Sequence, residues 1–74
     1  MMGCTSNIVS RQTQARFLTL GKQRARTNWS NKARKQYGWS YRKWSKAQNK
    51  GYQVDIRGED VLLYKVRAYG TPCN

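Results

Sequence analysis

Residues 29–37 read WSNKARKQY. Trp29, Ala33 and Tyr37 recur there at every fourth position. Residues four apart lie on one face of an α-helix, so the spacing predicts a helix with an apolar inner face and a basic outer one. Gly38 follows directly and is suited to end the helix, because glycine adopts the left-handed conformation common after the last turn.

Two further helices are predicted, one on each side of this segment. Upstream, residues 10–20 have Ser10 as a candidate N-cap. The basic segment 22–27 is then either a connector or a continuation of that helix. Downstream, Ser40 is a candidate N-cap for a helix over residues 40–50. We therefore expect two to three short helices in the first fifty residues.

After residue 51 the apolar spacing changes from helical to alternating, which is typical of β-strands. We expect strands over 52–57 and 61–69, joined as an antiparallel hairpin. The residues on its inner face would be Tyr52, Val54, Ile56, Leu62, Tyr64 and Val66. Turn chemistry favours a two-residue loop, whereas the alternation favours a three-residue loop over 58–60 that sets Ile56 opposite Leu62. We adopt the three-residue loop, because the other register places polar side chains in the apolar row.

The outer face of this hairpin carries two neighbouring aliphatic residues, Val61 and Leu63. Exposed aliphatic residues in a row indicate an interface. We predict that Val61 and Leu63 contact a protein partner or a second copy of the chain. Packing against the N-terminal residues Ile8 and Val9 is almost equally compatible with the pattern.

The charge of the chain is strongly one-sided. Its 74 residues include fifteen Lys and Arg but only three Asp and Glu, a net charge of +12, and residues 1–54 contain twelve bases and no acid. Folding does not need such an imbalance, and self-repulsion weakens the compact state, so the charge indicates a polyanionic partner. Nucleic acid is the first candidate, followed by an anionic membrane and an acidic protein.

The length of the chain suits one small domain. We expect this domain to span residues 10–69, between a flexible N-terminus (1–9) and a flexible C-terminus (70–74). No apolar run approaches the ~18 residues of a membrane span and no signal peptide is visible. The sequence therefore predicts an intracellular protein, cytoplasmic or nucleoid-associated, with no membrane partner. The expected fold class is α+β, with the helices followed by the C-terminal antiparallel β-hairpin.

Two cysteines, Cys4 and Cys73, lie near the chain ends. Two thiols without a histidine do not make a zinc site, and we expect no other cofactor. A disulfide between them would close nearly the whole chain, but an intracellular setting argues against it, so two free thiols are expected. Histidine and a glycine-rich phosphate loop are also missing from the sequence, so we predict that the protein is not an enzyme.

Residues 33–50, ARKQYGWSYRKWSKAQNK, resemble a helix-turn-helix motif, in which a glycine makes the turn and apolar residues lock the second helix across the first. The residues in the corresponding places are Ala33, Tyr37, Gly38, Trp39, Trp44 and Ala47. With residues 10–20 as a leading helix and the hairpin as a wing, the order of elements resembles winged helix-turn-helix DNA-binding proteins. The resemblance implies that the helix over 40–50 enters the major groove of duplex DNA.

The same resemblance implies which side chains contact nucleic acid. Arg42 would contact a guanine and Asn49 an adenine, while lysines of the helix contact phosphates. The predicted nucleic-acid-binding residues are Arg34, Lys35, Ser40, Tyr41, Arg42, Lys43, Ser45, Lys46, Asn49 and Lys50.

The aromatic residues of this region could form the core or a surface on which bases stack. A domain of this size has few other large apolar residues, so the core interpretation is favoured for most of them. We expect Trp29, Tyr37, Trp39 and Trp44 in the core. Tyr41 and Tyr52 suit either role.

Taken together, these features predict a small, strongly basic, non-catalytic nucleic-acid-binding protein. Duplex DNA is favoured over RNA by the order of elements, although the mixture of basic and aromatic residues suits structured or single-stranded RNA equally. The alternative is a small viral or mobile-element modulator that binds a host protein acting on nucleic acid and inhibits or redirects it.

Overall fold

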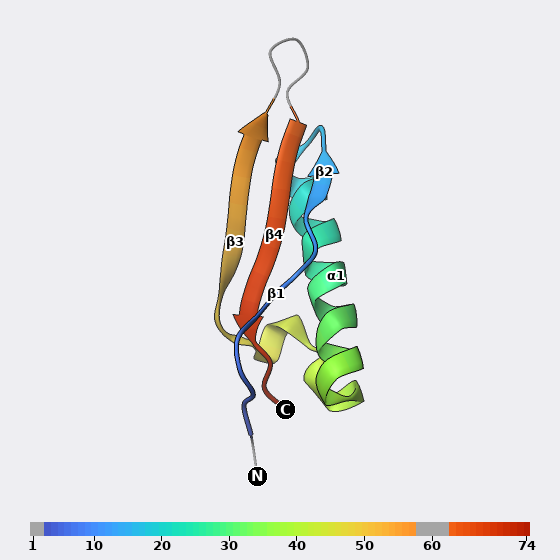
Figure 1. Cartoon of the computed structure of the whole chain (residues 1–74), viewed down its shortest axis with the longest axis vertical. Helices are drawn as coiled ribbons and strands as arrows, with labels where there is room; N and C mark the ends of the chain where they lie inside the picture. The colour runs from blue at the N-terminus through green and yellow to red at the C-terminus, as the bar shows by residue number, and fades with distance from the viewer. Residues whose placement is uncertain (1–2, 58–62) are drawn as a thin grey trace.

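The computed structural model describes residues 3–57 and 63–74, in which one α-helix packs on an antiparallel sheet (Figure 1). The elements are β1 (Ile8–Val9), β2 (Thr13–Ala15), α1 (Leu18–Tyr37), the 3₁₀ turns η1 (Trp39–Tyr41) and η2 (Trp44–Lys46), β3 (Gln48–Arg57) and β4 (Leu63–Thr71). The predicted α+β class is confirmed, but the described residues form a single α-helix instead of two or three.

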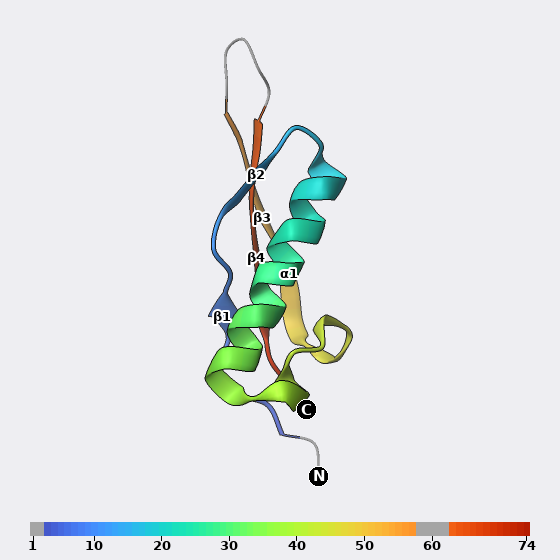
Figure 2. The same cartoon turned by 90° about the vertical axis from the view of Figure 1, so that its right-hand side faces the viewer.

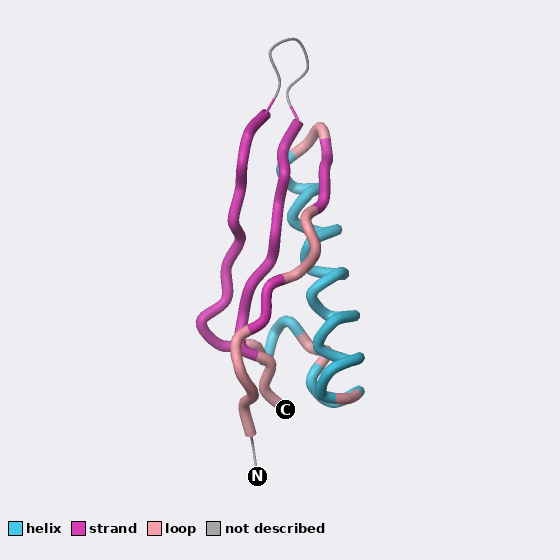
Figure 3. The backbone as a smooth tube through the Cα atoms, in the orientation of Figure 1, coloured by secondary structure: helices cyan, strands magenta, loops and turns pink. Residues whose placement is uncertain are grey.

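The sheet is organised around β4, its central strand. β3 pairs with one edge of β4, and β1 and β2 pair in turn with the other edge, all antiparallel. β1 and β2 are thus two short pieces of one interrupted path along β4 (Figure 3). α1 lies against one face of the sheet beside β4 and β2, whereas β3 is the far edge strand (Figures 1 and 2).

α1 approaches β4 closely because its inner face consists of small residues around one large residue. Gly21, Ala25, Trp29 and Ala33 are its buried residues, spaced four apart. A Cβ atom on Gly21 would lie 2.8 Å from Cγ2 of Val66, so the first turn reaches β4 only with glycine at this position. The predicted inner face with Trp29 and Ala33 is confirmed, and the helix extends upstream to Leu18.

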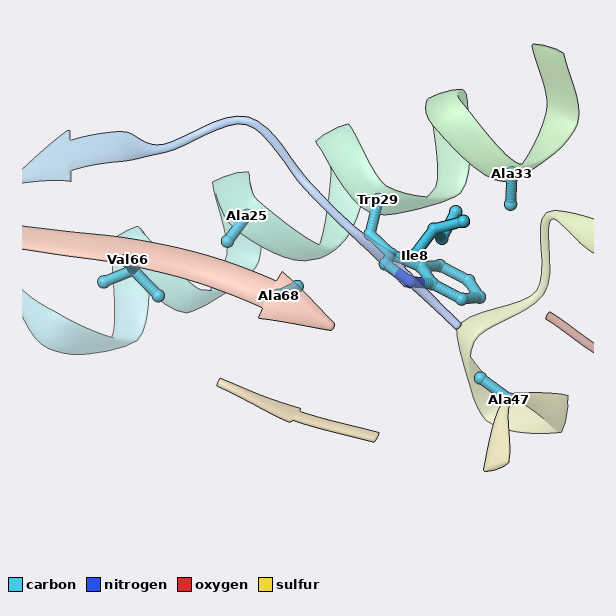
Figure 4. Close-up of a cluster of buried hydrophobic side chains, with 7 residues drawn as sticks. All are labelled: Ile8, Ala25, Trp29, Ala33, Ala47, Val66 and Ala68. Atoms are coloured by element: carbon cyan, nitrogen blue, oxygen red, sulfur yellow. The ribbon is translucent and has the colours of Figure 1, made fainter. Parts of the chain in front are cut away.

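The core is small and centred on Trp29 (Figure 4). The buried cluster comprises Ile8, Ala25, Trp29, Ala33, Ala47, Val66 and Ala68. Four of these seven residues are alanine, so the indole of Trp29 provides most of the apolar surface in the cluster. Its Nε1–H donates to the carbonyl oxygen of Gly70 at 3.4 Å, and the ring of Trp44 packs edge-on at a centroid distance of 5.0 Å.

The helix predicted over residues 10–20 is wrong in its first half. Thr13 and Ala15 point inward from β2, which pairs with β4, and only from Leu18 onward is the chain helical. The edge of β4 provides backbone partners for these residues, whereas a helix that began at Ser10 would leave the N–H groups of its first turn without partners inside the helix. The basic segment 22–27 is confirmed as a continuation of the helix.

The helix predicted over residues 40–50 is also wrong. This segment forms η1 and η2 and then enters β3 at Gln48, four residues before the expected strand. Gln48 pairs with Thr71, and a bulge follows in which Asn49 has φ 51°. The described residues therefore lack the second helix of the helix-turn-helix motif, since its first part forms short 3₁₀ turns and its end, from Gln48, pairs with β4.

The β3–β4 hairpin is confirmed, with a different register. Ile56 pairs with Tyr64 instead of Leu62. A shift by two residues leaves the described side chains of both strands on their predicted faces, so the assignment of their inner and outer rows is unaffected. The predicted loop over 58–60 and Val61 lie outside the described residues.

The two ends of the chain are joined. Cys4 and Cys73 form a disulfide, with Cα atoms 4.1 Å apart and a sequence separation of 69, so the prediction of free thiols is wrong. That prediction rested on the expected intracellular location. Antiparallel pairing of the N-terminal segment with the end of β4 brings the two cysteines together. The core also extends beyond the predicted bounds of 10–69, because Ile8 and Pro72 are buried.

We expect Trp29→Ala to lower the free energy of unfolding by about 3–5 kcal/mol, because it empties the centre of the core. The matched control is Trp39→Ala, which should stay within about 0.5 kcal/mol of the wild type because Trp39 is 65% exposed. Urea unfolding followed by circular dichroism measures both. Equal losses in the two variants would show that the core is not centred on Trp29.

Replacing Cys4 and Cys73 together with serine should lower the free energy of unfolding by roughly 4 kcal/mol, since the disulfide closes a long loop of the unfolded chain. Thermal unfolding of the wild type with and without reductant gives an independent measurement. Two reactive thiols in the native, unreduced protein would contradict this part of the structure.

Candidate nucleic-acid interface

Nearly all charged side chains in the described part of the chain are positive. All fifteen Lys and Arg residues lie in it, whereas Asp55 is the one acid there. α1 alone carries Lys22, Arg24, Arg26, Lys32, Arg34 and Lys35, with no acid. Because the small buried residues occupy its inner face, these bases lie on the flanks and outer side of the helix.

Four basic residues converge on a groove between the second half of α1 and the segment that links β1 to β2. The groove has a volume of about 550 Å³. Its lining consists of Arg11, Lys32, Arg34 and Lys35 with the amide side chains of Asn28, Asn31 and Gln36. No acid of the described chain contributes to this lining, which we call the basic groove.

Helix geometry builds one wall of the basic groove. Asn28, Asn31, Lys32 and Lys35 are three, four and seven residues apart and therefore share one side of α1. The ammonium of Lys32 donates to the carbonyl oxygen of Val9 at 2.8 Å, which ties the helix to the N-terminal segment and holds a positive charge in place.

The remaining cations of the basic groove are available to a ligand. Arg11 comes from the link between β1 and β2, opposite the helix. Within residues 3–57 and 63–74, the side chains of Arg11, Arg34 and Lys35 make no hydrogen bond or ion pair. Guanidinium groups bind phosphate through paired hydrogen bonds, and amide side chains add contacts to phosphate or sugar. The groove is therefore chemically suited to a phosphate backbone.

The structure divides the predicted nucleic-acid-binding residues among three places. Arg34 and Lys35 line the basic groove. Ser40, Tyr41, Arg42, Lys43, Ser45 and Lys46 lie in η1, η2 and the link between them, and Asn49 and Lys50 lie in β3. They do not share the face of one helix, as the helix-turn-helix resemblance had implied. The ammonium of Lys50 instead donates to the carbonyl oxygens of Trp44 and Ser45, at 2.9 and 3.3 Å.

Arg11, Lys32 and the three amides of the basic groove were missed by the sequence reasoning. The spacing of Asn28, Asn31, Lys32 and Lys35 could have shown a polar helix side. Nothing local to Arg11 shows that it faces α1, since the antiparallel pairing of the N-terminal segment with β4 places it there.

The predicted aromatic core is correct for Trp29, which is fully buried, while Tyr37 and Trp44 are half-buried against it. The prediction is wrong for Trp39, which is 65% exposed. Gly38 has φ 109° and turns the chain out of the helix, so Trp39 no longer follows the inner face of α1. Tyr52 packs against the core.

Part of the inner apolar row of the hairpin is exposed. Val54 and Ile56 have exposed fractions of 43% and 58%, although they lie on the face of the sheet that carries α1. α1 lies over β4 and β2 and does not reach this part of β3 (Figure 1). Leu63, one of the two predicted interface residues, is half-buried at the start of β4.

Other classes of site find no support in the described residues. They contain no group of three or more Cys, Asp, Glu or His side chains that could hold a metal ion. No helix among them has the length and apolar character needed to cross a membrane. Comparison with known proteins finds no matching family model, curated protein or solved structure.

Proposed function

We propose that this is a non-catalytic nucleic-acid-binding protein that holds a phosphate backbone in the basic groove. The observation that carries the proposal is the convergence of Arg11, Lys32, Arg34 and Lys35 on one groove without an acid. Three of these four cations have no partner within the described chain, so a bound polyanion would complete their interactions.

The whole-chain charge supports the same ligand class. A net charge of +12 on 74 residues attracts polyanions over long range and destabilises the unliganded fold through repulsion. Neutralising phosphates releases their condensed counterions, which makes such binding favourable at low salt and weak at high salt.

The proposed binding mode differs from that of a recognition helix. Contacts from the basic groove go to phosphates, which position a protein on nucleic acid without reading its sequence. We therefore expect low sequence specificity, and we keep structured or single-stranded RNA beside DNA as a ligand. The absence of histidine from the chain and the pairing of both cysteines support a role without catalysis.

We keep the intracellular location as part of the proposal. The disulfide adds a requirement, because Cys4 and Cys73 stay paired only where the local redox conditions are oxidising enough. Alkylation of thiols in intact cells, followed by mass spectrometry of the protein, tests whether this requirement is met. Recovery of the protein only from the culture medium would contradict the location.

The test compares two variants that each lose three positive charges. The first is Arg11→Gln, Arg34→Gln and Lys35→Gln, which empties the basic groove of its unpaired cations. The matched control is Arg16→Gln, Lys65→Gln and Arg67→Gln, which removes the same charge outside the lining of the groove. Affinity for a labelled oligonucleotide is measured by fluorescence anisotropy over a range of salt concentrations.

We expect the slope of log affinity against log salt to fall by roughly 2–3 units in the groove variant, about one for each lost phosphate contact. The control variant should keep most of the slope. Equal loss in both variants would mean diffuse attraction without a groove site. Wild-type binding that is absent, or independent of salt, would refute the proposed function.

A second candidate function, contact with a protein, is favoured by the exposed Val54 and Ile56. Burying each could stabilise a complex by about 1.5–3 kcal/mol. If a second copy covers them, replacing both with threonine should reduce the molar mass measured by light scattering from dimer to monomer, without loss of fold. If the wild type stays monomeric at high concentration, Val54 and Ile56 are not covered by a second copy of the chain.

A further inference from the structure

The most exposed tryptophan of the structure lies directly after α1. Trp39 is the first residue of η1 and is 65% exposed, whereas Trp29 is fully buried and Trp44 is half-buried against the core. Burial of an indole stabilises a small domain, so an indole left in water contributes almost nothing to this fold. Its position calls for an explanation other than packing.

The ring of Trp39 is held in place by Arg42. The guanidinium carbon of Arg42 lies 3.9 Å from the ring centroid, and its Nη1 donates to the carbonyl oxygen of Trp39 at 3.3 Å. A guanidinium this close covers one face of the indole. The exposed area therefore belongs mainly to the edge and the opposite face of the ring, which is wide enough for one nucleobase.

Trp39 also lies next to the end of α1 that carries the basic groove. The backbone N–H of Gly38 donates to the carbonyl oxygen of Arg34 at 2.9 Å, and Trp39 is the next residue after this last helical hydrogen bond. η1 packs back against α1, with the rings of Tyr37 and Tyr41 5.9 Å apart. The exposed ring thus follows directly on the last turn of α1, which carries Arg34 and Lys35 of the basic groove.

This combination matches the chemistry of single-stranded nucleic acid. A positively charged groove follows the backbone, and an aromatic ring stacks on an unpaired base regardless of its identity. In a duplex both faces of each base are already stacked, so the ring would have no partner. We infer that Trp39 is a base-stacking site and that single-stranded DNA or RNA is the preferred ligand, an inference that rests on the proposed function.

The experiment measures the affinities of the whole, oxidised protein for three probes, in anisotropy titrations at fixed salt. The probes are oligo(dT) and oligo(U) of about ten nucleotides and a DNA duplex of the same length. The variants are Trp39→Leu, Trp39→Phe and Phe17→Leu. Phe17 is a matched control, because it is 69% exposed but precedes α1, roughly 30 Å of helix away from Trp39.

We expect Trp39→Leu to weaken binding of the single strands by roughly 5- to 100-fold, with Trp39→Phe in between and Phe17→Leu within about twofold of the wild type. Duplex affinity should be nearly unchanged in all three. Single strands should also quench the tryptophan emission of the wild type but not that of Trp39→Phe. A difference between the oligo(dT) and oligo(U) arms shows which of the two strands, the thymidine or the uridine strand, is preferred.

Two results would overturn the inference while leaving the proposed function intact. One is a wild type that binds the duplex as tightly as the single strands. The other is a Trp39→Leu variant with unchanged single-strand affinity. This result would show that the Arg42–Trp39 contact is a local surface interaction without a role in binding. A wild type with no salt-dependent affinity for any probe would instead refute the proposed function itself.

Discussion

The burial of a single indole, that of Trp29, between α1 and β4 is the interaction on which the rest of the structure depends. Alanine supplies most of the other buried side chains, so the domain has no second large group to replace this ring. The ring can lie there only because Gly21, Ala25 and Ala68 let helix and strand approach one another. Its Nε1–H is satisfied by Gly70, which avoids the cost of a buried unpaired donor.

This close packing also determines where the charge lies. Since the inner face of α1 admits only small residues and Trp29, its six bases lie on the flanks and the outer side. Lys32 then bridges to Val9, and the N-terminal segment brings Arg11 across from the helix. The basic groove is thus a consequence of how the helix lies on the sheet, and the disulfide between Cys4 and Cys73 ties down the segment that forms its other wall.

The sequence predicted those features that depend on local periodicity. The spacing of Trp29 and Ala33 revealed the inner face of α1, and the alternation around Val54 and Ile56 revealed the faces of the hairpin. Features that depend on pairing between distant segments were missed. The helix predicted over 40–50 is not formed, and β3 begins within this segment, at Gln48, which pairs with β4. Arg11 lies at the groove because β1 and β2, on either side of it, pair with β4. Trp39 was assigned to the core from its place in the helix-turn-helix pattern and from the scarcity of other large apolar residues, although Gly38 directs it outward.

The central claim is that the tryptophans divide into a core ring, Trp29, and a ligand-binding ring, Trp39, at the end of the helix that carries the basic groove. Titration with a single-stranded oligonucleotide, followed by ¹H–¹⁵N NMR, tests it directly, because each of the three tryptophans gives its own indole resonance. The account predicts that the indole signal of Trp39 and the backbone amides of Arg34 and Lys35 shift, while the indole signal of Trp29 does not. Shifts confined to the face of the sheet that carries Lys65 and Arg67, with the Trp39 indole unmoved, would contradict it.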